Sequence, residues 1–230
     1  MSGRAVQESF GLYLVLTEPV AGYEACTEAA VRTGVRYVQL RMKRRPRAEV
    51  LETASRLRRI TAGSATRFIV NDDVAIAAEA DADGVHLGQD DMDLAAARLR
   101  WPDAGKIFGL STHNEEQEMR ARELAPDYIG VGPVFPTPTK EHPDPTLGVE
   151  RMGRIVRSSP LTTVAIGGID RGKLADVLRH GAVNYCVLRA VNLDPNPEAA
   201  IRALQEIWRE RAGHAPGLSK LASDRVSGPG

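Results

Sequence analysis

The chain has 230 residues, 43% of them hydrophobic, and its 30 basic residues balance 30 acidic ones to give a formal net charge of zero. This length and apolar content suffice for one full-sized core, and the neutral charge argues against nucleic acid or an acidic membrane surface as a partner. Two distant cysteines, Cys26 and Cys186, argue against a disulfide framework or a zinc site and fit a cytoplasmic protein.

Short β-rich runs alternate with amphipathic, alanine- and leucine-rich stretches along the chain. Because strands that alternate with helices form parallel sheets, eight such units predict a single (β/α)8 TIM barrel over residues 11–212. A doubly wound open sheet is the alternative, although no Gly-x-Gly-x-x-Gly follows the first run. The eight runs are GLYLVLT (11–17), YVQLRMK (37–43), RFIVND (67–72), GVHLG (84–88), KIFGLS (106–111), YIGVGPV (128–134), TTVAIGG (162–168) and NYCVLRAV (184–191).

The two ends of the chain differ in composition from the repeating part. Residues 1–10 form an N-terminal extension without a long apolar run, so we expect no signal peptide and no membrane span. Residues 197–212 predict a strong closing helix with Pro197 near its start. Residues 213–230 are rich in Gly, Ser and Pro, which predicts a disordered tail.

The second run alternates apolar with long polar side chains. If Val38, Leu40 and Met42 face the outer helices, then Gln39, Arg41 and Lys43 face the barrel axis. Unpaired cations in a barrel interior are costly, so this pattern favours an anionic ligand. A polar edge strand, or an internal salt bridge to Asp72 or Asp91, is the alternative.

Two acidic turns follow neighbouring runs, at the end of the barrel where active sites lie. Asn71, Asp72 and Asp73 follow the third run, and Asp90 and Asp91 follow the fourth. Such residues are good helix N-caps, but two acidic turns side by side also offer carboxylates to one Mg²⁺ ion. His86 lies on the fourth run, where a ligand contact and simple packing in the barrel mouth are equally favoured.

Two further segments favour phosphate. The loop VFPTPTK carries Thr137, Thr139 and Lys140, which suit a phosphate clamp, although a surface loop is the alternative. Gly167 and Gly168 let the backbone approach a ligand after the seventh run, and Leu188 and Arg189 follow in the eighth, where barrels often bind phosphate. Two clamps indicate two phosphorylated substrates, and a diphosphate held by Mg²⁺ and lysines is typically a leaving group.

Taken in order and spacing, several motifs resemble the thiamine-phosphate synthase family. They are QLRMK, IVNDDVAIAAEADADGVHLGQDD, GLSTH, DYIGVGPVFPTPTK, AIGGI and VLRAV, and they extend from about Gly11 to Trp208. The resemblance implies a (β/α)8 transferase that joins 4-amino-2-methyl-5-hydroxymethylpyrimidine diphosphate to 4-methyl-5-(2-phosphooxyethyl)thiazole. The products would be thiamine phosphate and diphosphate, formed by dissociative displacement at the pyrimidine methylene carbon.

The resemblance also implies roles for individual residues. Arg41, Lys43, Ser111 and Lys140 would be catalytic, and Mg²⁺ would be the cofactor. The implied contacts are Gln39, Arg41, Lys43 and Asn71 with the pyrimidine diphosphate, Ser111 and Lys140 with the same substrate, Thr137 and Thr139 with the thiazole, Gly168, Leu188 and Arg189 with its phosphate, and Asp72 and Asp91 with Mg²⁺. His86 is also expected to bind substrate, without assignment to one of the two.

Two departures from the family pattern stand out. Met42 replaces a glutamate that family members often carry, and its outward direction predicts little effect on the chemistry. Arg189 stands where some members have serine, so either its side chain or only its backbone would bind phosphate.

Three other functions remain as alternatives. The first is a thiazole tautomerase of the same fold that uses His113, although such relatives typically lack the set Lys43, Asp72, Asp91 and Lys140. A ligand-binding regulator and a Schiff-base aldolase are less favoured, because the anion-binding set is complete and its lysines lie among expected anion contacts. The sequence leaves the oligomeric state open, a homo-oligomer included.

Overall fold

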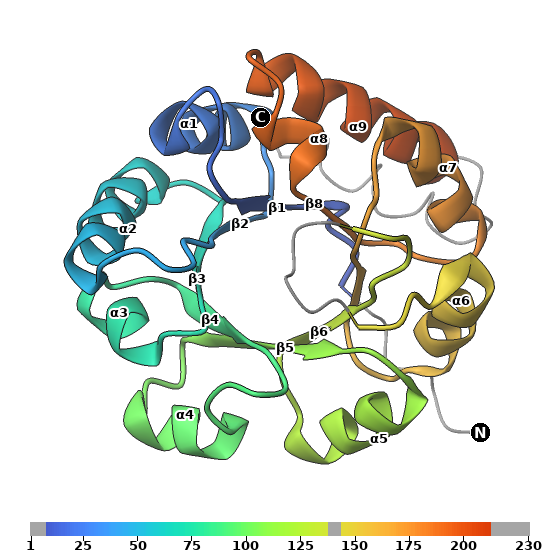
Figure 1. Ribbon diagram of the computed structural model, residues 1–230, viewed down its shortest axis with the longest axis horizontal. Helices are drawn as coiled ribbons and strands as arrows, with labels where there is room; N and C mark the ends of the chain where they lie inside the picture. The colour runs from blue at the N-terminus through green and yellow to red at the C-terminus, as the bar shows by residue number, and fades with distance from the viewer. Residues whose placement is uncertain (1–7, 138–143, 213–230) are drawn as a thin grey trace, which may run out of the picture.

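Eight parallel strands close into a barrel in sequence order, with the last strand pairing with the first. The computed structural model describes residues 8–137 and 144–212. Helices surround the barrel as an outer ring (Figure 1). The predicted (β/α)8 TIM barrel is therefore confirmed, and the open sheet is excluded.

The strands are shorter than the runs that predicted them. They are β1 (Leu12–Leu16), β2 (Tyr37–Leu40), β3 (Arg67–Asn71), β4 (Gly84–Leu87), β5 (Ile107–Thr112), β6 (Tyr128–Val131), β7 (Thr163–Ala165) and β8 (Tyr185–Val187). The helices are α1 (Tyr23–Thr33), α2 (Arg47–Thr61), α3 (Val74–Glu79), α4 (Leu94–Arg100), α5 (Glu115–Leu124), α6 (Gly148–Ser158), α7 (Arg171–Arg179), α8 (Arg189–Asn192) and α9 (Pro197–Ala212). The closing helix α9 has the predicted bounds.

Side-chain caps fix where several helices begin. Asp73 accepts a hydrogen bond from the Ile76 amide and caps α3, as one residue of the first acidic turn was expected to do. In the second acidic turn the cap of α4 is Asp93, which accepts hydrogen bonds from two amides of the first turn. Asp91 is therefore not needed as a cap and remains available to the site.

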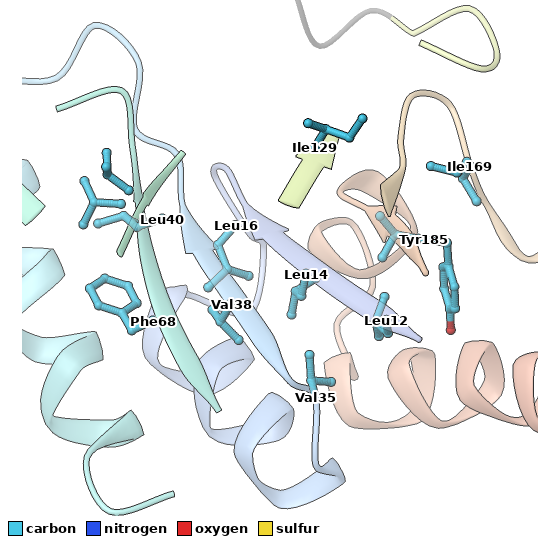
Figure 2. Packing of buried hydrophobic residues seen from close by; sticks show 14 of the residues in the cluster. Leu12, Leu14, Leu16, Val35, Val38, Leu40, Phe68, Ile129, Ile169 and Tyr185 are labelled. Atoms are coloured by element: carbon cyan, nitrogen blue, oxygen red, sulfur yellow. The ribbon is translucent and has the colours of Figure 1, made fainter. Parts of the chain in front are cut away.

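The core lies between the strands and the helix ring. Leu14 and Leu16 of β1 and Val38 and Leu40 of β2 are buried there against helical side chains (Figure 2), and Met42 packs against the same cluster. The outward face predicted for residues 37–43 is confirmed. Each such leucine or valine contributes about 1.5–3 kcal/mol to stability by leaving water.

A second, smaller cluster fills the barrel interior. Tyr13, Tyr37, Ile69 and Tyr128 are buried in it. Phe10 lies against Tyr37 with ring centroids 4.7 Å apart, so it packs onto the barrel although it precedes β1. These rings close the floor of the barrel, at the N-terminal ends of the strands.

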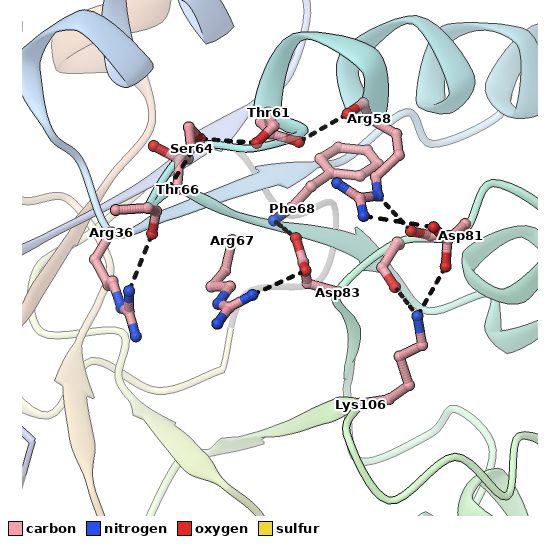
Figure 3. A network of polar contacts seen from close by, with 12 residues as sticks. Arg36, Arg58, Thr61, Ser64, Thr66, Arg67, Phe68, Asp81, Asp83 and Lys106 are labelled. Atoms are coloured by element: carbon pink, nitrogen blue, oxygen red, sulfur yellow. Dashed lines mark hydrogen bonds and ion pairs between the residues drawn. The ribbon is translucent and has the colours of Figure 1, made fainter.

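Charged residues at the N-terminal ends of the strands are paired with one another (Figure 3). Asp83 accepts a hydrogen bond from the Phe68 amide at 2.8 Å and lies 3.3 Å from the Arg67 guanidinium. Asp81 receives Lys106 at 2.9 Å and Arg58 at 3.4 Å. Since these groups satisfy each other, this face serves stability, as is usual in such barrels.

Among the helices that the structure describes, none combines the length and the apolar character that crossing a bilayer requires.

Candidate active site

Two adjoining hollows open at the C-terminal ends of the strands. The inner one has a volume of about 380 Å³ and reaches into the barrel, and the outer one, of about 1080 Å³, lies at the mouth. Five residues line both, namely Arg41, Asn71, His86, Ser111 and His113. The predicted site residues at the ends of β2, β3, β4 and β5 are therefore brought together.

A chain of hydrogen bonds crosses the floor of the inner hollow. Gln39 Nε2 donates to the Tyr13 hydroxyl at 2.9 Å, and this hydroxyl lies 2.7 Å from that of Tyr128. The Tyr128 hydroxyl lies 3.0 Å from His86 Nδ1, and His86 Nε2 lies 2.9 Å from Ser111 Oγ. Gln39, His86 and Ser111 were predicted to bind substrate, whereas nothing in the sequence predicted the two tyrosines.

Glycines shape this interior in two different ways. A Cβ atom at Gly109 would lie 2.4 Å from the Tyr128 hydroxyl and 2.6 Å from His86 Nδ1, so this glycine makes room for the hydrogen-bonded pair. A Cβ at Gly130 would lie 3.7 Å from the nearest atom, in His86, which is ordinary contact. Gly130 lines the inner hollow, so its missing side chain leaves space for a ligand.

The two cations after β2 have different surroundings. Lys43 forms an ion pair with Asp72. The side chain of Arg41 forms no hydrogen bond or ion pair with any residue in 8–137 or 144–212, and burial lowers its pKa, an effect that the charge of Asp72 partly offsets. Arg41 lines both hollows. A half-buried guanidinium without a partner calls for an anion.

Asp72 and Asp91 lie together in the outer hollow and share a hydrogen bond between their carboxyl groups. Burial, together with this hydrogen bond, raises the pKa of Asp72 to about 6. Burial also acts to raise the pKa of Asp91, but its hydrogen bonds from Asp72 and from the Gly88 amide, with the charge of Lys43, lower it overall. Asp72 has a φ of 64°, a left-handed conformation that is rare outside glycine and often found at functional sites.

This carboxyl pair suits a hard divalent cation. Two carboxylates at a mouth open to solvent and substrate match the way proteins hold Mg²⁺, which takes one or two carboxylates and completes its shell with water and phosphate oxygens. No cluster of three or more His, Cys, Asp or Glu side chains with metal-binding geometry occurs in the described part of the chain. A cation here would therefore depend on oxygens from water or substrate.

Opposite these charges, a glycine loop borders the inner hollow. Gly167 and Gly168 have φ of 102° and 64°, and a Cβ at Gly168 would lie 2.7 Å from the Pro136 carbonyl oxygen. Both glycines line the hollow together with Leu188 and Arg189. Arg189 was predicted to lie in the eighth strand, and this prediction is wrong. Because β8 ends at Val187, Arg189 is instead the first residue of α8.

Lys173 adds a cation that was not predicted from the sequence. It lines the inner hollow, and its Nζ donates to the Gly168 carbonyl oxygen at 3.1 Å and to Asp170 at 2.7 Å. It also lies 5.4 Å from the centre of the Phe135 ring. Its position in the first turn after a Gly-Gly loop was the available signal.

The loop after β6 is described only in part. Thr137 lies at the edge of the inner hollow, as predicted. Thr139 and Lys140, which were predicted to contact the thiazole and the diphosphate, lie outside the described residues.

His113 is held between two oxygens. Its Nδ1 donates to the Gly132 carbonyl oxygen at 2.6 Å, and its Nε2 lies 3.3 Å from Asp144. The ring lines both hollows, but both of its nitrogens already have a protein partner.

Comparisons with known proteins agree on one family. The family model described as thiamine monophosphate synthase matches residues 12–191. The chain is 41% identical over 187 residues to a thiamine-phosphate synthase of Archaeoglobus fulgidus, which covers 81% of this chain and 87% of that protein. It is 38% identical over 200 residues to the one of Methanospirillum hungatei, covering 86% and 97%.

Solved structures give the same result. A thiamine phosphate pyrophosphorylase from Pyrococcus furiosus superposes with a TM-score of 0.80 at 31% identity, over 88% of this chain and 96% of that one. A 3-hexulose-6-phosphate synthase superposes with a TM-score of 0.60 at 16% identity over 85% and 99%, which shows only that the barrel fold is shared.

Proposed function

Since this chain belongs to the thiamine monophosphate synthase family, we propose that it joins 4-amino-2-methyl-5-hydroxymethylpyrimidine diphosphate to 4-methyl-5-(2-phosphooxyethyl)thiazole and releases thiamine phosphate and diphosphate. The observation that carries the proposal is that two anion-seeking regions border the two adjoining hollows. Arg41 and Lys43 line the outer hollow, Arg41 also lines the inner one, and the loop with Gly167 and Gly168 lines the inner hollow.

The diphosphate binds at the mouth of the barrel. Arg41 supplies a cation whose side chain is unpaired among residues 8–137 and 144–212, and Lys43 is available once its carboxylate partner Asp72 is engaged elsewhere. Both cations stabilise negative charge that grows on the departing diphosphate, so they favour the transition state over the ground state. Lys140, from the loop after β6, adds a third cation.

Asp72 and Asp91 hold Mg²⁺ in this proposal. Both carboxylates would hold the ion, which would supply positive charge that makes diphosphate a better leaving group. The two residues must lose the proton that they share before both can bind the ion, so metal binding should weaken below about pH 6, where Asp72 is protonated. The nearby Lys43 charge then keeps both carboxylates ionised.

The pyrimidine ring occupies the inner hollow. Gln39, Asn71 and Ser111 offer polar groups there, and Val164, Ile166 and Cys186 supply apolar walls. Such walls limit the access of water to the carbon that loses diphosphate, so that the thiazole nitrogen rather than water forms the new bond. Positioning of the two substrates supplies much of the remaining rate.

The thiazole phosphate binds at the opposite wall. Backbone amides after β7 and at the start of α8, near Gly168 and Arg189, lie where barrels of this type commonly hold phosphate. Thr137 borders the ring of the same substrate, together with Thr139. Lys173 adds positive charge to this wall.

The decisive experiment is a reconstitution with purified protein, both precursors and Mg²⁺, in which thiamine phosphate and diphosphate are measured together. We expect equal amounts of the two products, and loss of both when EDTA removes the metal. The matched control variant Arg67→Gln changes an arginine of the opposite face and should retain activity. Absence of product would refute the synthase, and isomerisation of the thiazole alone would instead indicate a tautomerase.

A further inference from the structure

The hydrogen-bond chain beneath the inner hollow has a direction that its chemistry determines. Its members are Gln39, Tyr13, Tyr128, His86 and Ser111, in that order, and they come from five different strands of the barrel: β2, β1, β6, β4 and β5. Each hydroxyl has one proton to donate, and an amide nitrogen can only donate. The protons can therefore be counted along the chain.

The count starts at Gln39. Its Nε2 donates to the Tyr13 oxygen, so the Tyr13 proton goes to Tyr128, the other group that bonds to it in the described structure. Tyr128 has then received one proton and donates its own to His86 Nδ1. Burial raises the pKa of Tyr13 and of Tyr128 far above the usual value, so both hydroxyls keep their protons near neutral pH.

The last two members follow from this order. A neutral His86 that accepts at Nδ1 carries its hydrogen on Nε2, and this nitrogen donates to Ser111 Oγ at 2.9 Å. The Ser111 hydroxyl has then accepted inside the chain, and no acceptor for its own proton occurs among residues 8–137 and 144–212. Since Ser111 lines the inner hollow, that proton is directed to a ligand.

We propose that Tyr13 and Tyr128 are positioning residues, which fix the His86 tautomer and thereby present the Ser111 hydroxyl as a hydrogen-bond donor to a ligand in the inner hollow. The site then selects a ligand with an acceptor atom at this point. The identity of that atom rests on the proposed function, where it is a ring nitrogen of the aminopyrimidine.

The packing around the hydrogen-bond chain holds its members in fixed positions. Tyr13 and Tyr128 are 2% and 3% exposed, and their rings lie 5.5 Å apart. The Gly109 position is kept free of a side chain by the Tyr128 hydroxyl and the His86 ring. Tyr37 stacks on Tyr13 at 5.4 Å but its hydroxyl interacts with Arg36, so it offers a matched control from the same aromatic cluster.

The first test needs no substrate. Nitrogen-15 NMR of the free protein with labelled histidine reports which ring nitrogen of His86 carries the hydrogen. We expect the Nε2–H tautomer in the wild type and in Tyr37→Phe, and a mixture of tautomers in Tyr128→Phe. An Nδ1–H tautomer in the wild type would overturn the proposal, whatever the activity of the protein.

The second test is kinetic. We expect Tyr128→Phe to lower kcat/KM for the pyrimidine diphosphate about tenfold, with a change of less than about twofold in KM for the thiazole phosphate. Tyr13→Phe, which keeps the Tyr128 hydroxyl and serves if Tyr128→Phe folds poorly, should give a smaller loss. Wild-type kcat/KM in both variants would overturn the proposal.

A double-mutant cycle separates positioning from general damage. If Tyr128 acts through the serine, then Tyr128→Phe should cost about twofold or less in a Ser111→Ala background. Additive effects would assign Tyr128 a merely structural role. If the wild type forms no thiamine phosphate, the proposed function fails, while the tautomer measurement still decides on the hydrogen-bond chain.

Discussion

Asp72 and Asp91 share a hydrogen bond at the mouth of the barrel, although they follow different strands and both carry carboxyl groups. Two neighbouring carboxylates repel each other, so without a metal one of them keeps a proton well above the usual range. A divalent cation would therefore compete with this proton for the pair.

The first prediction concerns this proton. The carbon-13 shift of the Asp72 carboxyl should titrate near pH 6 without metal, because the pKa of Asp72 is raised to about 6 by burial and by the hydrogen bond to Asp91. Saturating Mg²⁺ should move that midpoint below about 5, since the cation competes with the proton. A midpoint near 4 in the free protein would contradict the prediction.

The raised pKa of Asp72 also makes the stability of the protein depend on pH. A carboxyl whose pKa is higher in the folded than in the unfolded protein binds its proton more tightly when folded. Its contribution to stability is therefore present below about pH 4 and lost as the pH rises through about 6. The variant Asp72→Asn should show a smaller decline in the free energy of unfolding across this range, measured by urea denaturation.

The second prediction concerns Arg41. Replacement by Gln should lower kcat/KM for the pyrimidine diphosphate by about a hundredfold, because a charge-assisted contact to the leaving group is lost. The free energy of unfolding should stay equal or rise slightly, since the removed cation is half-buried and its side chain has no hydrogen bond or ion pair within the described part of the chain. Marked destabilisation with unchanged kinetics would instead show that Arg41 has a structural partner.

The third prediction compares two glycines of the barrel interior. Gly109→Ala should lower the free energy of unfolding by about 1–3 kcal/mol, because its Cβ overlaps the Tyr128 hydroxyl. Gly130→Ala should leave stability unchanged or higher, since its Cβ meets only ordinary contact, but it should raise KM by filling the hollow. Thermal unfolding and steady-state kinetics measure both. Equal effects of the two substitutions would contradict this picture.

The fourth prediction concerns the glycine loop. Gly168→Ala should raise KM for the thiazole phosphate with little change in KM for the pyrimidine diphosphate, because a left-handed φ of 64° and a 2.7 Å approach to the Pro136 carbonyl exclude a side chain. Gly172→Ala is the matched control, since its Cβ would meet only Asp170 at 3.4 Å. An effect on the pyrimidine diphosphate alone would place that substrate at this loop instead.

Periodicity was sufficient to predict the barrel and the facing of its strands. The alternation from Val38 to Met42 gave the correct inner and outer faces, because the strand period is short and the two environments differ strongly. Strand ends were less predictable: Arg189 begins a helix, since the change from strand to helix depends on pairing with neighbours that the local sequence does not contain.

The site was predictable where residues are chemically unusual for their place. Arg41 and Asp72 stand out as charges beside buried strands, so their convergence could be expected. Tyr13 and Tyr128 could not be found in this way, because a tyrosine in an apolar strand is typical of a core. Their role depends on partners from three other strands, which only the closed barrel brings within hydrogen-bond distance.

Phe10, Tyr13 and Tyr37 close the N-terminal end of the barrel, so within the described part of the chain the inner hollow opens at the C-terminal ends of the strands. Substrates and products that pass through this opening must therefore enter and leave in a fixed order. In the proposed reaction the pyrimidine ring enters the inner hollow first, and its diphosphate remains at the mouth of the barrel, where Arg41 lies. Diphosphate then lies between the new product and solvent, so we expect diphosphate to dissociate before thiamine phosphate. Added diphosphate should therefore slow the release of thiamine phosphate.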